Sequence, residues 1–458
     1  MPFASALPIR SHLTTHHQHQ TDPSPRQLKH RSCHSSTELL CLPMTNSASL
    51  PTNVPSMTTP ERPSKRPVPT PSKTIAVVNS SGRQAASFIR VASAVGYRVR
   101  AQLRNLNGII ATEISCLPNV TVLVGDLYIQ KSSDTPETAG ESSLTDINYE
   151  LIRELYRGAQ LAFINTTFWG DEVSIGKALA DEAVAAKVEH YIYSSMPDHA
   201  AHNPSWPSLP LWSSKAMIED YILTLPYLST RATFIYTGIY NNNFTSLPYP
   251  LFCMAIQPDN SFEWTAPFHP DAPLPWLDAE HDVGPAVLQI FKDGVSQWGC
   301  GERIALAYEV LSPREACRVF SRGVGRPVRY MHDPKIEVKV HIPNGYREQL
   351  LALEQMYGLG TADPKFQPFY FGSEFLEKSC PNQAMEVWEG YRGLEEYARE
   401  VFPLEESANG LTWMNDEQVV PLNQAEEKNR IAMEEGKDEG FTAASESLPA
   451  RREEGWLA

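Results

Sequence analysis

The sequence predicts an α/β protein: a Rossmann-type, doubly wound parallel sheet followed by a smaller, mixed α/β portion. Short apolar runs rich in β-branched residues recur between residues 74 and 236, and such runs are typical of buried parallel strands. Helical patterns separate these runs, and a loop containing Gly82 lies between the first run and the first helical pattern. Strands that alternate with helices favour a parallel sheet covered on both faces.

The elements follow one another in a regular order. Strands are expected at 74–79, 98–103, 120–124, 161–164, 190–195 and 233–236. Helices are expected from Ala85 to Val95, where Gly96 ends the pattern, and at 149–157, 171–186 and 213–225.

Beyond Tyr240 the pattern becomes irregular and Pro-rich up to Asp278. Helices at 282–291 and 313–322, a strand at 304–307, an extended piece at 327–330 and a late helix at 384–401 follow. We therefore expect one domain over 73–403, with a dinucleotide-binding part at 73–240 and a smaller part at 241–403. The insertion at 128–145 is expected to be a surface loop.

Both ends of the chain differ in composition from this domain. Residues 1–72 are rich in Pro, Ser, Thr and His and lack apolar periodicity, so we expect a disordered extension. Residues 404–458 carry thirteen Asp/Glu against five Lys/Arg, and we expect an acidic, disordered tail.

Composition excludes several classes of protein. No run of about 18 or more apolar residues occurs, so no transmembrane helix is expected. The net charge of −15 makes the chain a poor partner for DNA phosphates. The seven cysteines form no C-x-x-C pair, which argues against a disulfide framework or a zinc site and favours a reducing compartment.

The loop from Asn79 to Ala85 is a candidate phosphate-binding loop. Short-chain reductases place Gly-x-x-Gly-x-x-Gly here, and this chain has Asn79, Gly82 and Ala85 at the three positions. The turn must be tight, the backbone must approach a pyrophosphate, and the helix must pack closely on the sheet. Asn tolerates positive φ better than most residues, so it can occupy the first position.

Cofactor choice depends on the end of the second strand. An NAD enzyme keeps Asp or Glu there for the ribose hydroxyls, whereas residues 99–105 contain no acid. Arg83 and Arg104 could both reach a 2′-phosphate. We expect both NAD and NADP to bind.

The catalytic tyrosine of short-chain dehydrogenases is missing. In those enzymes a Tyr phenol exchanges the proton, a Lys four residues later on the same helix face supports it, and a Ser follows the fifth strand. Ser194 or Ser195 and Lys215 are present, but Leu211 stands four residues before Lys215. Lys215 can still hold ribose hydroxyls, so binding can survive where hydride chemistry does not.

Motifs along the whole core resemble the NmrA-like family of fungal nitrogen metabolite repression regulators, which are atypical extended short-chain reductases. The matching segments are residues 75–79, 82–87, 163–167, 190–198 (HYIYSSMPD), 238–251 (GIYNNNFTSLPYPL), 275–285 (PWLDAEHDVGP), 345–350 and 396–403. Both ends and the 128–145 insertion lie outside the resemblance.

The resemblance implies a non-enzymatic co-repressor that binds oxidised NAD or NADP and discriminates against the reduced forms. It also implies a GATA-type zinc-finger activator as partner, with no direct DNA or membrane contact, in nucleus and cytoplasm. The implied cofactor-binding residues are Asn79, Ser80, Ser81, Gly82, Arg83, Gln84, Arg104, Asn105, Asp126, Asn165, Thr166, Thr167, Lys215, Tyr236, Gly238, Tyr240 and Asn241.

Two questions stay open at the level of sequence. Asp278, Glu280 and Asp282 could face a basic zinc finger, or Asp282 could simply be the N-cap of the helix that follows. An active NADPH-dependent reductase similar to isoflavone reductases is the alternative function, because such relatives can use a lysine instead of the usual tyrosine.

Overall fold

The computed structural model describes residues 71–130, 145–168, 170–340, 342 and 344–414. The expectations for residues 1–70, for the inner part of the insertion and for the tail beyond 414 lie outside these residues. No helix in the described ranges is long and apolar enough to cross a membrane.

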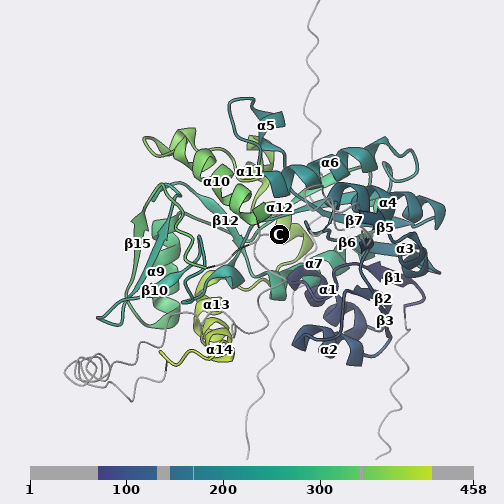
Figure 1. The fold of residues 1–458 in the computed structure, drawn as a ribbon, viewed down its shortest axis with the longest axis horizontal. Coiled ribbons are helices and arrows are strands. Elements are labelled where there is room, and N and C mark those ends of the chain that lie inside the picture. Colours follow the sequence, from purple (N-terminus) through teal and green to yellow (C-terminus); the bar gives the residue numbers. More distant parts are fainter. Residues whose placement is uncertain (1–70, 131–144, 169, 341, 343, 415–458) are drawn as a thin grey trace, which may run out of the picture. The chain divides into compact units, whose positions relative to one another are not determined.

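A seven-stranded parallel sheet forms the centre of the fold (Figure 1). Its order is β3-β2-β1-β6-β7-β8-β13, with β1 Thr74–Val77, β2 Arg98–Leu103, β3 Val120–Val124, β6 Leu161–Ile164, β7 His190–Ser195, β8 Ala232–Thr237 and β13 Glu302–Leu306. The doubly wound fold and its first six strands are confirmed. The seventh, expected in the smaller part, instead extends the main sheet, because Glu302 to Leu306 pair in parallel with Thr233 to Thr237.

Alternate residues of the strands bury opposite faces of the sheet. Ile75 and Val77 belong to one core cluster, and Ala76 and Val78 belong to the other. The first cluster also contains residues of α1 Arg83–Ala94, α2 Ile109–Cys116 and α7 Ala279–Asp293. The second contains residues of α3 Tyr149–Tyr156, α4 Glu172–Ala185 and α6 Pro210–Thr224.

Two small sheets, a hairpin and further helices complete the fold. The sheets are β10 Met254–Ile256, β11 Phe262–Ala266 and β15 Val328–His332, and β14 Glu309–Leu311, β12 Leu274–Leu277 and β9 Ile239–Tyr240; the hairpin pairs β4 Tyr128–Gln130 with β5 Thr145–Ile147. The helices are α5 His199–His202, η1 Asn241–Asn243, α8 Val295–Trp298, α9 Pro313–Val324, α10 Asn344–Gly358, η2 Pro364–Phe366, α11 Glu374–Ser379, α12 Asn382–Val387, α13 Leu394–Glu400 and α14 Phe402–Ala408.

Two expectations for the C-terminal region were wrong. The single helix expected at 384–401 is divided into α12 and α13, because the chain is extended at Trp388 and Gly393 caps α13 with an extended backbone. The boundary at 403 falls inside α14, whose buried Glu406 accepts hydrogen bonds from the hydroxyl of Thr245 and the amide of Ser246. The fold therefore continues past the expected boundary.

Helix α7 lies directly against α1. A Cβ on Gly284 would come within 2.5 Å of the carbonyl oxygen of Ser87, and the Gly284 amide donates to the Ser87 hydroxyl at 3.0 Å. The two helices can approach this closely only because position 284 has no side chain. This approach joins the start of the sheet to residues about 200 positions later.

We predict that Gly284→Ala lowers the free energy of unfolding by about 2 kcal/mol, because α1 and α7 must separate to admit the methyl group. Urea unfolding measures the change. Gly358→Ala is the matched control, since nothing lies within 4 Å of a Cβ at that position in α10. A Gly284→Ala protein as stable as the control variant would contradict the close-packing account.

Candidate functional site

The loop after β1 forms a tight turn. Asn79 has a φ of +50°, and the Gly82 amide donates to the Asn79 carbonyl at 2.9 Å. Gly82 is the N-cap of α1 and carries no side chain that could bond the first-turn amides. Those N–H groups and the positive end of the helix dipole therefore form a site suited to an anion.

Gln102, which sequence reasoning missed, holds this turn. Its buried side chain accepts from the Asn79 amide at 3.0 Å and donates to the Gly125 carbonyl at 2.8 Å. The backbone carbonyl of Gln102 accepts from the Ser80 amide at 3.0 Å. The available signal was an amide side chain inside the otherwise apolar end of β2. Gln102 connects the turn to the loop after β3.

A polar crevice opens beside the turn, at the carboxyl ends of the strands. From β1 the chain first adds β2 and β3 on one side and then crosses to β6 on the other side of β1, so the order of the strands reverses between β1 and β6. Open α/β sheets bind ligands at such switch points. The crevice is lined by Val78, Asn79, Gln102, Arg104, Asp126, Leu127, Tyr128, Asn165, Thr166, Thr167 and Ile175.

Six of the residues expected to bind cofactor therefore line the crevice, namely Asn79, Arg104, Asp126, Asn165, Thr166 and Thr167. Ser81 and Gly82 lie in the turn beside it. The lining contributes both a guanidinium, from Arg104, and a carboxylate, from Asp126. Sequence reasoning missed Leu127, Tyr128 and Ile175, which supply apolar walls.

Other expected residues are engaged elsewhere. The Ser80 hydroxyl donates to the Val77 carbonyl, and Asn105 is exposed and accepts from the Asn107 amide. The Tyr236 hydroxyl donates to buried Glu219 at 2.9 Å. None of these three side chains lines the crevice, so their assignment as direct ligands has no support in the geometry.

The residues expected near the nicotinamide lie further along the molecule. Gly238 and Tyr240 line a separate, aromatic cavity. Gln84, the second residue of α1, donates to the Tyr240 hydroxyl at 2.5 Å. Asn241 is fully buried, and neither the nitrogen nor the oxygen of its side-chain amide has a hydrogen-bond partner among the described residues.

Lys215 lies on α6 in a buried polar cluster. Its ammonium donates to the Asn165 side chain at 3.2 Å and to the Thr166 carbonyl at 2.6 Å, and it lies 3.3 Å from Glu172. The side chains of Lys215 and Glu172 are only 6% and 5% exposed, so each neutralises the other's buried charge. Sequence reasoning missed Glu172, which nothing in its local pattern distinguishes from an ordinary first-turn acid.

Leu211 lies one helical turn before Lys215, as the spacing predicted. It is the second residue of α6, is 8% exposed, and packs in the core. Its amide donates to the Gln349 side chain of α10 at 3.0 Å.

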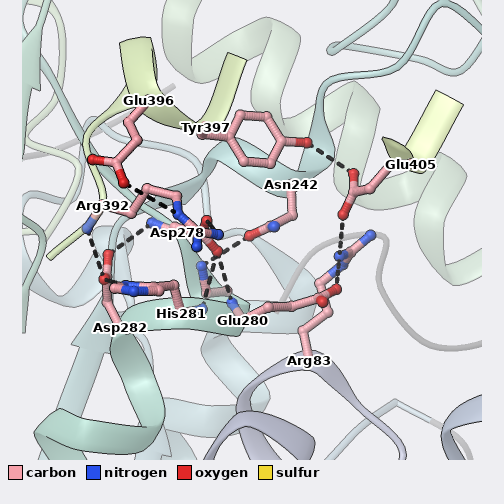
Figure 2. A network of polar contacts seen from close by, with 11 residues as sticks. Arg83, Asn242, Asp278, Glu280, His281, Asp282, Arg392, Glu396, Tyr397 and Glu405 are labelled. Atoms are coloured by element: carbon pink, nitrogen blue, oxygen red, sulfur yellow. Dashed lines mark hydrogen bonds and ion pairs between the residues drawn. The ribbon is translucent and has the colours of Figure 1, made fainter. Parts of the chain in front are cut away.

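Arg83, expected to bind cofactor, is held by two carboxylates. Its guanidinium is paired with Glu280 of α7 and lies 3.5 Å from the Glu405 carboxylate of α14. Figure 2 shows these contacts. Burial lowers the pKa of Arg83, but the neighbouring Glu280 and Glu405 carboxylates outweigh burial and raise it overall. Arg83 thus connects the first turn of α1 with two later helices.

Asp278 and Asp282 are fully buried, so the expectation that they face a partner was wrong. Asp278 caps α7 by accepting from the amides of Glu280 and His281, and it pairs with Arg392 at 3.2 Å (Figure 2). The N-cap of α7 is therefore Asp278 and not Asp282, for which capping was the alternative.

Asp282 instead joins α7 to the loop before α13. It accepts from the Arg392 amide at 3.0 Å and bonds the His281 ring at 2.6 Å. Burial raises the pKa of Asp282, whereas the hydrogen bond to Asp282 raises the pKa of His281. Of the three acids expected at the partner surface, only Glu280 has a partly exposed side chain.

The sheet order, the turn into α1 and the crevice at the switch point define a Rossmann-type fold of the dinucleotide-binding class. More specifically, the chain belongs to the NmrA-like family, which matches residues 71–398.

Two fungal relatives are similar over most of the chain. The nitrogen metabolite repression protein nmr of Neurospora crassa is 66% identical over 78% of this chain and 74% of its own length. The nitrogen metabolite repression protein nmrA of Emericella nidulans is 51% identical over 75% of this chain and 98% of its own.

Solved structures agree with this placement. A crystal structure of NmrA described as a negative transcriptional regulator in complex with NAD is 52% identical, with a TM-score of 0.66, over 75% of this chain and 99% of that one. A structure of NmrA in complex with NADP has the same identity and coverage and a TM-score of 0.65.

We predict that Glu172→Gln lowers the free energy of unfolding by about 3–5 kcal/mol, because it leaves the Lys215 ammonium buried without a counter-charge. Adding Lys215→Met to the same protein is expected to restore most of the loss. Urea unfolding of the two variants measures both effects.

Glu374→Gln is the control, since it breaks an exposed pair with Lys378 and is expected to leave the unfolding midpoint nearly unchanged. A Glu172→Gln protein that unfolds at the wild-type urea concentration would show that the buried pair is not needed.

Proposed function

We propose that this protein is a negative regulator of nitrogen metabolism that binds oxidised NAD or NADP as a ligand and does not catalyse hydride transfer. The observation that carries the proposal is the polar crevice beside an uncapped α1, in a chain 66% identical to a nitrogen metabolite repression protein. The protein acts in nucleus and cytoplasm.

The dinucleotide lies in the crevice with its pyrophosphate against the N-terminus of α1. The turn at Asn79 and Gly82 exposes the first-turn amides to the phosphates. Arg104 and Asp126 lie at the adenosine end, where a guanidinium suits a 2′-phosphate and a carboxylate suits ribose hydroxyls. The presence of both groups supports binding of NADP as well as NAD, as in the two NmrA complexes.

The nicotinamide end supports binding without reduction. Leu211 has no proton to exchange, and it stands where the short-chain reductase mechanism needs a phenol. Lys215 is already paired with Glu172, and the negative charge of this carboxylate offsets the positive charge of the Lys215 ammonium. The dinucleotide is therefore retained as a signal of redox state.

A GATA-type zinc-finger activator is the proposed partner. The chain has a net charge of −15, which favours encounter with a basic domain. Because Asp278 and Asp282 are buried, the contact is made by other surface acids, and of the three candidates only Glu280 could contribute.

We predict that Gly82→Asp weakens NADP binding at least 30-fold, because the new carboxylate caps α1 and competes with the pyrophosphate for the same amides. A Cβ at position 82 would also lie 2.8 Å from the Asn79 side-chain nitrogen, so Gly82→Ala is the control for crowding of the turn. Gly108→Asp is the control for a new carboxylate at a helix N-cap. Gly108 is the N-cap of α2, lies outside the crevice lining and has open space around its Cβ. Calorimetric titration measures all three variants, and equal affinities would contradict the assigned phosphate site.

We predict that the full chain retains a GATA-type zinc finger in a pull-down at low salt, and that retention falls steeply as salt is raised because charge steers the encounter. A zinc finger with its surface Lys and Arg residues changed to Gln is the control. Absence of retention at low salt would contradict the partner assignment while leaving dinucleotide binding untouched.

A further inference from the structure

A buried ion pair lies directly behind one end of the polar crevice. The Lys215 ammonium donates to the Asn165 side chain and to the Thr166 carbonyl, and both of these residues line the crevice. The Glu172 carboxylate accepts from the Thr166 hydroxyl at 2.7 Å and lies 3.3 Å from the same ammonium. Both charges are therefore bonded to the wall of the space that the dinucleotide is proposed to occupy.

Further hydrogen bonds hold the Glu172 carboxylate in place. Its second oxygen accepts from the Ser214 hydroxyl, and the Thr166 hydroxyl also bonds the Tyr193 hydroxyl at 2.8 Å. Tyr193 is fully buried, and burial raises its pKa, so its phenol stays neutral. Of the side chains in this cluster only those of Glu172 and Lys215 are charged, so the cluster has no net charge.

The order of the strands places this ion pair at the nicotinamide end of the crevice. β2 and β3 lie on one side of β1, and β6 lies on the other. Arg104 and Asp126 follow β2 and β3, whereas Asn165 follows β6. A dinucleotide with its pyrophosphate at the N-terminus of α1 therefore has its adenosine on the side of β2 and β3 and its nicotinamide on the side of the ion pair.

Oxidised and reduced dinucleotides differ at this end by one charge. The oxidised nicotinamide ring is a cation, and the reduced ring is neutral. A lone buried ammonium would repel the cation and not the neutral ring, so it would favour the reduced form. Two unit charges about 10 Å apart, at an effective dielectric of about 20, interact strongly enough to change an affinity roughly tenfold. A carboxylate beside the ammonium cancels that repulsion.

We propose that Glu172 determines the redox preference of the crevice, because by neutralising Lys215 it admits the cationic nicotinamide of oxidised NAD or NADP. This role rests on the proposed binding of a dinucleotide in the crevice. Glu172 acts through its charge and not as a ligand. Its effect therefore appears in the ratio of the affinities for the oxidised and reduced forms, which differ only in the nicotinamide ring.

The test is calorimetric titration of NADP and NADPH into the full chain and its variants. The quantity compared is the preference, defined as the Kd for NADPH divided by the Kd for NADP. Glu172→Gln leaves a lone ammonium, and we expect it to lower the preference about tenfold. Adding Lys215→Met removes both charges, so the preference is expected to return to the wild-type value. Equal preferences in the wild type and Glu172→Gln would overturn the proposal.

Glu406→Gln is the matched control for the loss of a buried carboxylate. Glu406 is fully buried, but Thr245 and Ser246, which bond it, do not line the crevice, so the preference is expected to stay unchanged. A preference that falls as far in Glu406→Gln as in Glu172→Gln would show that loosened packing sets it, and would overturn the role of the Glu172 charge.

Urea unfolding shows first whether Glu172→Gln is folded, because a lone buried ammonium destabilises the fold. If it is not folded, Lys215→Met and the double variant are compared, since these two proteins differ only at position 172. We expect a preference at least about threefold higher in Lys215→Met, whose remaining carboxylate attracts the cationic ring. Equal preferences in these two variants would overturn the proposal.

The wild-type values separate the role of Glu172 from the proposed function. A wild-type chain that prefers NADPH contradicts the proposed binding of the oxidised form, whereas a further fall of the preference in Glu172→Gln still supports the role of Glu172. A wild-type chain that binds neither NADP nor NADPH contradicts both.

Discussion

The bonds from Gln102 to the turn at Asn79 are the constraint on which the rest of the site depends. They hold a residue with positive φ at the end of β1 and tie the turn to the loop after β3. With the turn fixed, α1 must begin at Arg83, and its uncapped first turn faces the point where strand order reverses. The crevice follows from this geometry rather than from any single ligand-binding side chain.

Buried charges join the early and late parts of the chain. Arg83 bonds Glu280 and lies close to Glu405, and Arg392 pairs with Asp278 (Figure 2). Such networks are costly to leave half-satisfied, so they specify one arrangement of α1, α7 and the C-terminal helices. This explains why Asp278 and Asp282, which the sequence suggested for a docking surface, are buried and connect elements of the interior instead.

The sequence predicted the sheet well, because strand burial is a local property. All seven main strands were predicted within two residues at each end. The turn residues were correct because Asn79 and Gly82 have backbone requirements visible in a short window. The role of Glu172 could not be predicted, since its partner Lys215 is 43 residues away. Asp278 and Asp282 were misplaced for the same reason: their burial depends on Arg392, more than 100 positions later. Similarly, β13 joined the main sheet through a pairing that no local pattern encodes.

We propose that the protein senses redox state by binding the oxidised dinucleotide in the crevice without catalysing hydride transfer. Calorimetric titration of the wild-type chain with NAD, NADP, NADH and NADPH under one set of conditions tests it most directly. Each oxidised form is expected to bind more tightly than its reduced counterpart. Tighter binding of NADH or NADPH would contradict it and would favour an active reductase.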